Sequence, residues 1–176
     1  MDSYREIVAF LEGTYDLRFF DSVIKPRLEE TYDLATPFLY AEDPPARVSK
    51  YIRSLKRIPR DYIFFADMNA AKCITQRKDR VSRKYRGVEI DKIVVVVKEI
   101  EAWYLAGLSA NACRTLRIKP LANTDHIDKE QFDNLRPQRF SSGIDFIIEI
   151  LKVYNPSVAI DRNSSFGYFC RKHLHR

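Results

Sequence analysis

One stretch near the start of the chain constrains the fold more than any other. The five residues Ile7 to Leu11 are all apolar, and this run ends at Glu12-Gly13. An apolar run without alternation indicates a strand that is covered on both faces, as in a parallel sheet. The following apolar residues recur at spacings of three and four, as on a helix that packs back on such a sheet: Leu17, Phe20, Val23, Ile24 and Leu28. We therefore expect a strand, a tight turn supplied by Gly13, and a helix.

Glu12 falls at the carboxyl end of this expected strand. Open α/β sheets build their binding sites at the carboxyl ends of their strands. The structural alternative for an acidic residue here is helix capping, and Thr14 or Asp16 is better placed to cap the helix that follows. A functional role is therefore the favoured interpretation of Glu12.

Three further apolar runs predict strands, at Pro37–Ala41, Tyr62–Ala66 and Ile93–Val97. Between the first two, Pro44-Pro45 marks a loop and a helix start, and Pro59 is expected to end that helix. Its apolar stripe is Val48, Tyr51, Ile52, Leu55 and Ile58. Strands that alternate with helices predict an α/β fold, a mainly parallel sheet of about four to five strands with helices on both faces.

The C-terminal part of the sequence is more loosely patterned. A helix at Ala102–Ala106 is expected to stop near Gly107, and we expect an α/β core over residues 1–109 and a mostly helical extension over 110–176, packed on the core. Within the extension, Lys119–Pro137 is expected to be a long surface loop that contains a short helix at Lys129–Leu135. Gly143–Tyr154 is apolar nearly all round, which favours a buried helix. Residues 163–165 are expected to cap a last helix, Phe166–His173.

The composition favours a reducing compartment and gives no sign of a membrane protein. The three cysteines form no CxxC pair. The first residues, MDSYRE, lack the regions of a signal peptide, and no apolar run approaches the roughly 18 residues of a membrane span. We therefore expect a cytoplasmic protein, with no membrane partner.

The positive charge is concentrated in one segment. Residues 72–86 carry seven basic residues against Asp79 alone, so this segment accounts for the whole formal net charge of +6. Such a cluster is typical of a surface that binds nucleic acid, although a solvated helix face would look the same. The candidate nucleic-acid-binding residues are Lys72, Arg77, Lys78, Arg80, Arg83, Lys84 and Arg86.

Acidic residues follow each of the predicted strands. They are Glu12, Glu42 or Asp43, Asp67, and Glu99 or Glu101. Parallel strands end at one edge of a sheet, and two carboxylates about 4 Å apart repel by about 4 kcal/mol at an effective dielectric constant near 20. A bound Mg²⁺ or Mn²⁺ would offset that repulsion, because hard cations take oxygen ligands.

Structural roles compete with this interpretation. Asp67 and Asn69 would both be good N-caps for a helix that begins near Ala70. Asp16 is also well placed as a cap. Glu99 and Glu101 could simply face solvent, so these two residues and Asp16 are secondary candidates for the site.

These residues carry a family resemblance. A buried strand that ends in Glu-Gly, followed two strands later by an Asp-x-Asp-like turn, resembles the Toprim (topoisomerase–primase) domain. The phrases FLEGTYDLRFF and KEIEAWYLAG also resemble a small Toprim-like family related to nucleases of the overcoming-lysogenization-defect type. The resemblance covers Arg5 to Gly107 and implies that Glu12, Asp67 and Asn69 are the metal-binding and catalytic residues.

The leading hypothesis is therefore an Mg²⁺-dependent nuclease or phosphotransferase acting on DNA or RNA. One departure matters: the second acid of the Toprim pair is Asn69 here, a neutral ligand, which favours one metal ion over two. Asn69 also favours the alternative, a binding or assembly module with a degenerate site, for which the resemblance implies an ATPase partner. A phospho-acceptor domain with Asp67 as acceptor is a third, weaker hypothesis. The nucleic acid's type and strandedness, and the oligomeric state, are left open.

Overall fold

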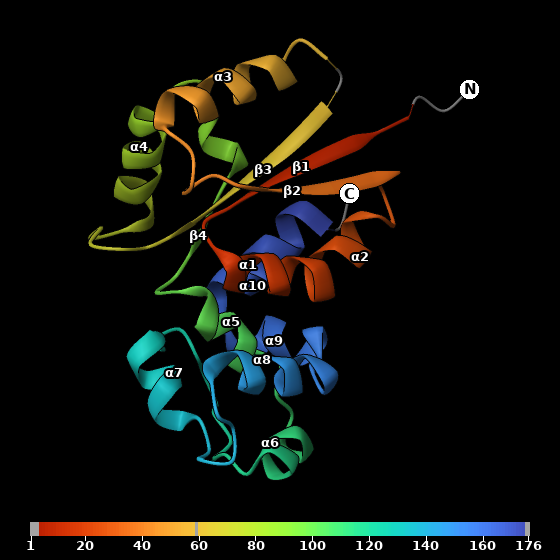
Figure 1. Ribbon diagram of the computed structural model, residues 1–176, viewed down its shortest axis with the longest axis vertical. Helices are drawn as coiled ribbons and strands as arrows, with labels where there is room; N and C mark the ends of the chain where they lie inside the picture. Colours follow the sequence, from red (N-terminus) through yellow and green to blue (C-terminus); the bar gives the residue numbers. More distant parts are fainter. Residues whose placement is uncertain (1–3, 59, 175–176) are drawn as a thin grey trace. The chain divides into compact units, whose positions relative to one another are not determined.

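The computed structural model describes residues 4–58 and 60–174 (Figure 1). The chain divides into two compact units, one that runs to Val96 and one that begins at Val97. This division precedes helix α5 (Ile100–Ala106), which the sequence-based boundary after residue 109 had assigned to the core. Each unit is described by itself below.

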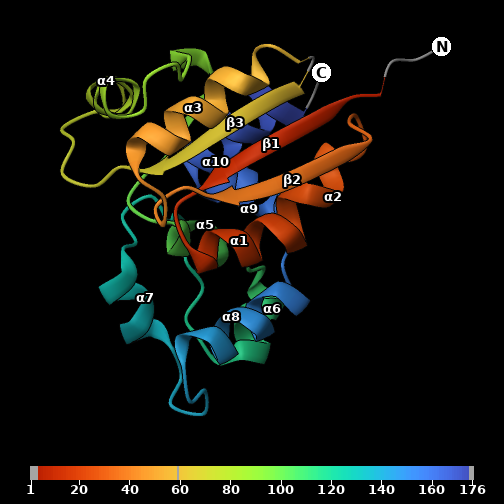
Figure 2. The ribbon, with the colours of Figure 1, turned by 45° about the horizontal axis from the view of Figure 1, so that its top comes forward.

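The first unit contains a four-stranded, all-parallel sheet. Its strands are β1 (Glu6–Leu11), β2 (Leu34–Leu39), β3 (Arg60–Asp67) and β4 (Ile93–Val96), in the order β2-β1-β3-β4. Figures 1 and 2 show β1 and β3 in the middle of the sheet. The predicted α/β class with a parallel sheet is confirmed.

Helices cover both faces of this sheet. One face carries a continuous helical run made of α1 (Thr14–Phe19), a π-helical turn (Phe20–Ile24) and α2 (Lys25–Leu28). The opposite face carries α3 (Pro45–Leu55) and α4 (Ile74–Lys84), as Figures 1 and 2 both show. A 3₁₀ turn (Ile90–Lys92) leads into β4.

The face under α3 and α4 has an aromatic core. Phe10 of β1 lies between Phe38 of β2 and Phe64 of β3 in register, and its ring centroid is 5.3 Å and 5.5 Å from theirs. Tyr40 and Tyr85 extend the cluster, with the Tyr40 ring 4.4 Å from that of Phe64. Rings in contact at these distances stabilise the fold beyond the area that they bury.

Four details of the first unit differ from expectation. Gly13 has extended backbone angles (φ −148°, ψ −173°), which any residue can adopt, so no glycine-specific turn is needed. Strand β2 spans Leu34–Leu39 and not Pro37–Ala41. Helix α3 ends at Leu55, so Ile58 lies beyond it and is exposed, and Pro59 falls outside the described residues. Helix α4 begins at Ile74 and not near Ala70.

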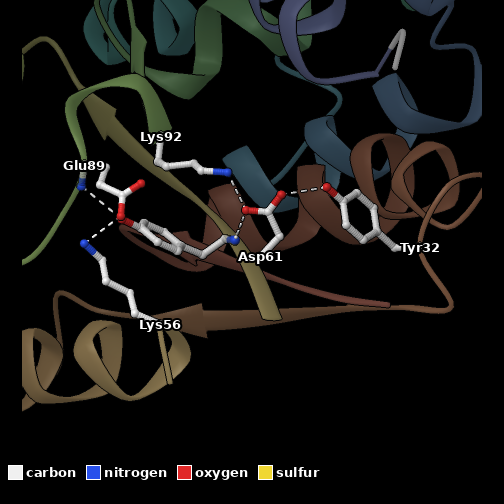
Figure 3. A network of polar contacts seen from close by, with 6 residues as sticks. Tyr32, Lys56, Asp61, Glu89 and Lys92 are labelled. Atoms are coloured by element: carbon white, nitrogen blue, oxygen red, sulfur yellow. Dashed lines mark hydrogen bonds and ion pairs between the residues drawn. The ribbon is translucent and has the colours of Figure 1, made fainter. Parts of the chain in front are cut away.

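A polar network joins segments at the amino-terminal edge of the sheet (Figure 3). The Asp61 carboxylate accepts hydrogen bonds from the Tyr32 hydroxyl at 2.8 Å and from Lys92 Nζ at 2.5 Å. Lys56 forms an ion pair with Glu89 at 2.6 Å nearby. Burial raises the pKa of Asp61, but the hydrogen bonds from Lys92 and Tyr32 outweigh it, so this pKa lies below its ordinary value. These contacts hold the starts of β3 and β4 together, opposite the edge where the acidic residues lie.

The second unit is helical in its described residues. Its helices are α5 (Ile100–Ala106), α6 (Ala110–Leu116), α7 (Lys129–Leu135), α8 (Gly143–Lys152), α9 (Pro156–Arg162) and α10 (Ser164–Phe169), followed by a π-helical turn (Cys170–Leu174). Trp103 is fully buried between the rings of Phe166 and Phe169 and donates a hydrogen bond to Ser165 Oγ at 2.8 Å. Asn163 caps α10 as predicted, because its side chain accepts from the Phe166 amide.

The predictions for the second unit were correct in part. The helix at Lys129–Leu135 is confirmed, whereas α6 and α9 were not predicted. Helix α8 is amphipathic and not buried all round, since Ile144 and Ile148 are exposed. No helix in residues 4–58 and 60–174 is long and apolar enough to cross a membrane.

Candidate functional site

The structure brings Glu12 and Asp67 together at the carboxyl-terminal edge of the sheet. Glu12 directly follows β1, and Asp67 is the last residue of β3, the strand beside it. The backbone N–H of Asp67 donates to Glu12 Oε2 over 3.4 Å, and both side chains are partly exposed. Two acidic residues that are 55 positions apart in the sequence therefore lie side by side at this edge, joined by a contact from the backbone of one to the carboxylate of the other.

Tyr40 restrains Glu12 from the opposite side. Its hydroxyl donates to Glu12 Oε2 over 3.3 Å, and its side chain is buried. Burial, together with the charge of Glu12, raises the pKa of Tyr40 far above its ordinary value, so the hydroxyl keeps its proton as a donor. Sequence analysis missed this residue. The register of β1 and β2 contains the only signal, because Leu11 lies opposite Leu39 and Tyr40 follows directly.

Arg77 is the basic residue that reaches the site. It lies in the first turn of α4, and its Nε donates to the backbone carbonyl oxygen of Asp67 over 2.5 Å. The sequence placed Arg77 among the nucleic-acid-binding residues, and the structure places it beside a candidate metal ligand. Its guanidinium group thus places a positive charge at the carboxyl-terminal end of β3.

Asn69 lies in the loop between β3 and α4. It is exposed and adopts a left-handed backbone conformation (φ +47°), which asparagine tolerates better than most residues. Cys73 is the N-cap of α4, so neither Asp67 nor Asn69 caps this helix. The capping explanation of these two residues is therefore wrong.

Asp16 takes part in the start of α1. Its Oδ2 accepts a hydrogen bond from the Gly13 amide at 3.1 Å, and the side chain is buried. Burial, with a smaller contribution from the negative charge of Glu12, raises the pKa of Asp16 to about 6. The cap role expected for Asp16 is confirmed, and the residue adds a proton-holding group next to Glu12.

The remaining basic residues of the segment lie along α4 and its ends. Arg77 and Lys78 are partly buried, and the others are exposed: Lys72, Arg80, Arg83, Lys84 and Arg86. Of the two acids after β2, Glu42 is exposed and Asp43 forms an ion pair with Arg47 at 2.7 Å. The structure thus gives Asp43 a partner away from Glu12.

Glu99 and Glu101 belong to the second unit and are described apart from Glu12 and Asp67. Glu99 is the N-cap residue of α5, and its Oε2 accepts from the Lys129 amide, the first residue of α7, at 2.5 Å. Glu101 is buried. The alternative that both side chains simply face solvent is therefore wrong, and their membership of the site stays a prediction.

The donor set suits a hard divalent cation held by few protein ligands. Glu12 and Asp67 supply carboxylate oxygens, and Asn69 supplies an amide oxygen two residues further on. Within residues 4–58 and 60–174, no group of three or more His, Cys, Asp or Glu side chains is arranged to hold a metal ion. Mg²⁺ commonly binds through one or two carboxylates, with water and substrate phosphate as its other ligands, so two carboxylates are compatible with it.

Comparisons of the chain with family models, curated proteins and solved structures give no significant match. The Toprim-like relationship therefore stays a prediction based on the residues quoted above.

Proposed function

We propose that this protein hydrolyses phosphodiester bonds in nucleic acid with the help of Mg²⁺ or Mn²⁺. The observation that carries the proposal is the meeting of Glu12 and Asp67 at the ends of adjacent parallel strands, joined by the hydrogen bond from the Asp67 amide to Glu12 Oε2 at 3.4 Å. Neither Glu12 nor Asp67 is the N-cap residue of the helix that follows it, so helix capping does not account for these two acids. The basic helix α4 follows Asp67 after a short loop, which supports a polyanionic substrate.

Each residue of the site has a chemical role in this proposal. Glu12 and Asp67, with Asn69, would hold the cation, which when bound would polarise the phosphoryl oxygen and lower the pKa of a water molecule. Tyr40 and the Asp67 amide restrain Glu12 Oε2, so the carboxylate has a defined orientation and keeps lone pairs for a cation or a proton. Arg77 fixes the end of β3 through the Asp67 carbonyl. The exposed cations of α4 would hold the phosphate backbone without reading its sequence.

The test is a cleavage assay with the pure protein. Supercoiled plasmid, linear duplex, single-stranded DNA and RNA are incubated with Mg²⁺, Mn²⁺ or EDTA, and Glu12→Gln and Asp67→Asn are assayed beside the wild type. We expect cleavage that requires a metal ion and falls by about 100-fold or more in both variants, since each removes a charged group from the reacting centre.

Glu30→Gln is the matched control, because Glu30 is an exposed glutamate just before β2, at the opposite edge of the sheet from Glu12. Its activity should equal that of the wild type. Cleavage that persists in EDTA, or that is equal in Glu12→Gln and wild type, would contradict the proposal and indicate a contaminating nuclease.

A second candidate function is a nucleic-acid-binding or assembly module without turnover, acting with an ATPase partner. Asn69 in place of an acid favours it, and so does the finding that no three His, Cys, Asp or Glu side chains of the described residues are grouped to hold a metal ion. No cleavage of any substrate by a folded protein that still binds nucleic acid in a salt-dependent way would support this second candidate over the first.

A further inference from the structure

The first unit has an open pocket away from the acidic residues. It has a volume of about 510 Å³ and is formed by the edge strand β2 and by α3. Its lining residues, which define what we call the α3 pocket, are Phe38, Arg47, Lys50, Tyr51 and Ser54. The pocket therefore combines two aromatic rings, two cations and a hydroxyl group.

The aromatic rings of the α3 pocket pack against each other and against a buried ring of the core. Phe38 and Tyr51 contact each other edge to face, with their ring centroids 4.9 Å apart. Both also contact Phe10, whose centroid is 5.3 Å from that of Phe38 and 5.6 Å from that of Tyr51. Phe10 is fully buried, whereas Phe38 and Tyr51 are only partly buried. The two rings thus present a rigid apolar surface to a ligand at low entropic cost.

The cations and the hydroxyl group come from one side of α3. Residues 47, 50, 51 and 54 are spaced by three and four, so they form a helical stripe separate from the buried stripe of Val48, Ile52 and Leu55. Lys50 is exposed. Arg47 forms an ion pair with Asp43 at 2.7 Å, but the Arg47 side chain is 72% exposed, so water screens the pair and Arg47 can contact a phosphate in its place.

We propose that the α3 pocket binds an unpaired nucleotide of single-stranded nucleic acid. The base would stack against Phe38 and Tyr51, and the adjoining phosphate would contact Lys50 and Arg47. Stacking on aromatic side chains beside a positive groove is the usual means of binding single strands without sequence preference. The bases of a duplex stack on one another and cannot offer their faces to recessed rings. An acidic peptide would satisfy the cations but would leave the aromatic rings without a stacking partner.

The pocket lies on the same face of the sheet as the contact to Glu12. Phe38 and Tyr40 are two residues apart, the Tyr40 amide continues the ladder by donating to Leu11 O, and alternate residues of a strand share a face. Two residues of extended chain span about 7 Å. A single strand in the α3 pocket could therefore extend along β2 towards Glu12. This link to cleavage rests on the proposed function, whereas binding in the pocket does not.

The test measures binding in EDTA, so that cleavage plays no part. The full-length protein is titrated against a fluorescently labelled 12-nucleotide single strand and against a duplex of the same sequence, and anisotropy is recorded. The variants are Tyr51→Leu, which keeps an apolar side chain on Phe10, and Lys50→Gln, which changes only an exposed side chain. Arg53→Gln is the control, because Arg53 is an exposed cation of α3 outside the pocket.

We expect the single strand to bind more tightly than the duplex. Tyr51→Leu should weaken single-strand binding by about tenfold and Lys50→Gln by about threefold or more, with a smaller effect of Arg53→Gln. A single strand containing 5-iodouracil should crosslink on irradiation to Tyr51 or Phe38, a result that a purely structural role would not produce.

Three results would overturn the proposal. They are equal binding of single strand and duplex, equal effects of Lys50→Gln and Arg53→Gln with no crosslink in the pocket, or displacement of the labelled strand by polyglutamate as efficiently as by unlabelled strand. If Glu12→Gln abolishes cleavage while the pocket variants bind normally, the α3 pocket proposal fails and the cleavage proposal stands. If the single strand binds in the α3 pocket as expected but no substrate is cleaved, the α3 pocket proposal stands and the cleavage proposal fails.

Discussion

At the scale of single residues, the environment of Glu12 is set by its neighbours on three sides. Tyr40 donates from the position after β2, the Asp67 amide donates from β3, and Asp16 lies close enough on α1 for the charge of Glu12 to raise its pKa. Because its pKa is about 6, Asp16 holds a proton below about pH 6 and is mostly charged at higher pH.

The raised pKa of Asp16 predicts a pH dependence of stability. Its ordinary pKa near 3.8 applies to the unfolded chain, and the folded value is about 6. Between these two values the folded state binds more protons, so this residue lowers the free energy of unfolding as pH rises from about 4 to about 6. Asp16→Asn keeps an oxygen acceptor for the Gly13 amide and removes the buried charge. We compare the free energy of unfolding of the variant with that of the wild type at each pH. The difference, variant minus wild type, should be larger at pH 7.5 than at pH 4 by about 1–3 kcal/mol.

Urea unfolding at both pH values measures this difference. Asp21→Asn is the matched control, because Asp21 is an exposed aspartate on the same helical run. If the stability curves of Asp16→Asn and wild type run parallel with pH, the buried carboxyl group does not have the raised pKa assigned to it.

At the scale of elements, two connections position side chains through their local conformation. They are the loop between β3 and α4 and the turn after α5. The first contains Asn69 in a left-handed conformation and leads into α4, from which Arg77 donates a hydrogen bond to the end of β3. The second is built around Gly107, the C-cap of α5, whose carbonyl oxygen accepts from the Asn155 amide at 2.9 Å. Glycine is required there by close packing, since its backbone angles (φ −80°, ψ 4°) are open to other residues.

Gly107→Ala should destabilise the second unit. A Cβ atom at this position would overlap the ring of Tyr154, and that ring is held because its hydroxyl donates to the Trp103 carbonyl oxygen at 3.0 Å. Forcing an extra methyl group into a packed region costs about 1–3 kcal/mol. Thermal unfolding followed by circular dichroism should show a lower Tm for this variant.

Gly13→Ser is the control for Gly107→Ala. Gly13 is extended, and a Cβ atom there would have Asp16 Oδ2 as its nearest neighbour, at 3.7 Å. Serine is a favoured N-cap residue, so the Tm should be unchanged or slightly higher. Equal losses in both variants would argue against the specific contact between Gly107 and Tyr154.

At the scale of the whole molecule, the distribution of charge is the main feature. The formal net charge of +6 is equal to the charge of residues 72–86 alone, and the structure forms most of this segment into α4. A concentrated positive field attracts a polyanion at long range and releases its counterions on binding, so affinity should fall steeply with salt.

Removing part of this field should change the salt dependence in a predictable way. The triple variant Arg80→Gln, Arg83→Gln, Lys84→Gln removes three exposed cations of α4. If each contacts one phosphate, the slope of log K against log salt for a single strand should become less steep by about two. Anisotropy titrations from low to physiological salt measure this slope.

The matched triple variant is Arg114→Gln, Arg117→Gln, Lys119→Gln, which removes the same charge from exposed positions in the second unit. It should leave the slope close to that of the wild type. Equal changes in the two triple variants would mean that net charge alone attracts the nucleic acid and that α4 is not its binding surface.

Much of the first unit could be predicted from local sequence patterns. Apolar runs located all four strands of the sheet, and their acidic ends located Glu12 and Asp67. The least accurate boundaries were at β2, which is partly exposed and contains Pro37, and at the start of α4, where residues 70–73 carry no strong cap or turn signal. Helices α6 and α9 were not predicted, whereas α7 was; each of the three is seven residues long, a length that gives no clear period, so apolar spacing predicts such helices unreliably.

The sequence by itself determined the strands, their acidic ends and the basic segment, because each depends on residues that are adjacent along the chain. The tertiary structure alone decided that Tyr40 and Asp67 both contact Glu12, that Arg77 reaches Asp67, and that Phe38 and Tyr51 share a pocket. These contacts join residues on different elements, between 10 and 55 positions apart. They follow from the strand order β2-β1-β3-β4, which the apolar runs along the chain do not encode.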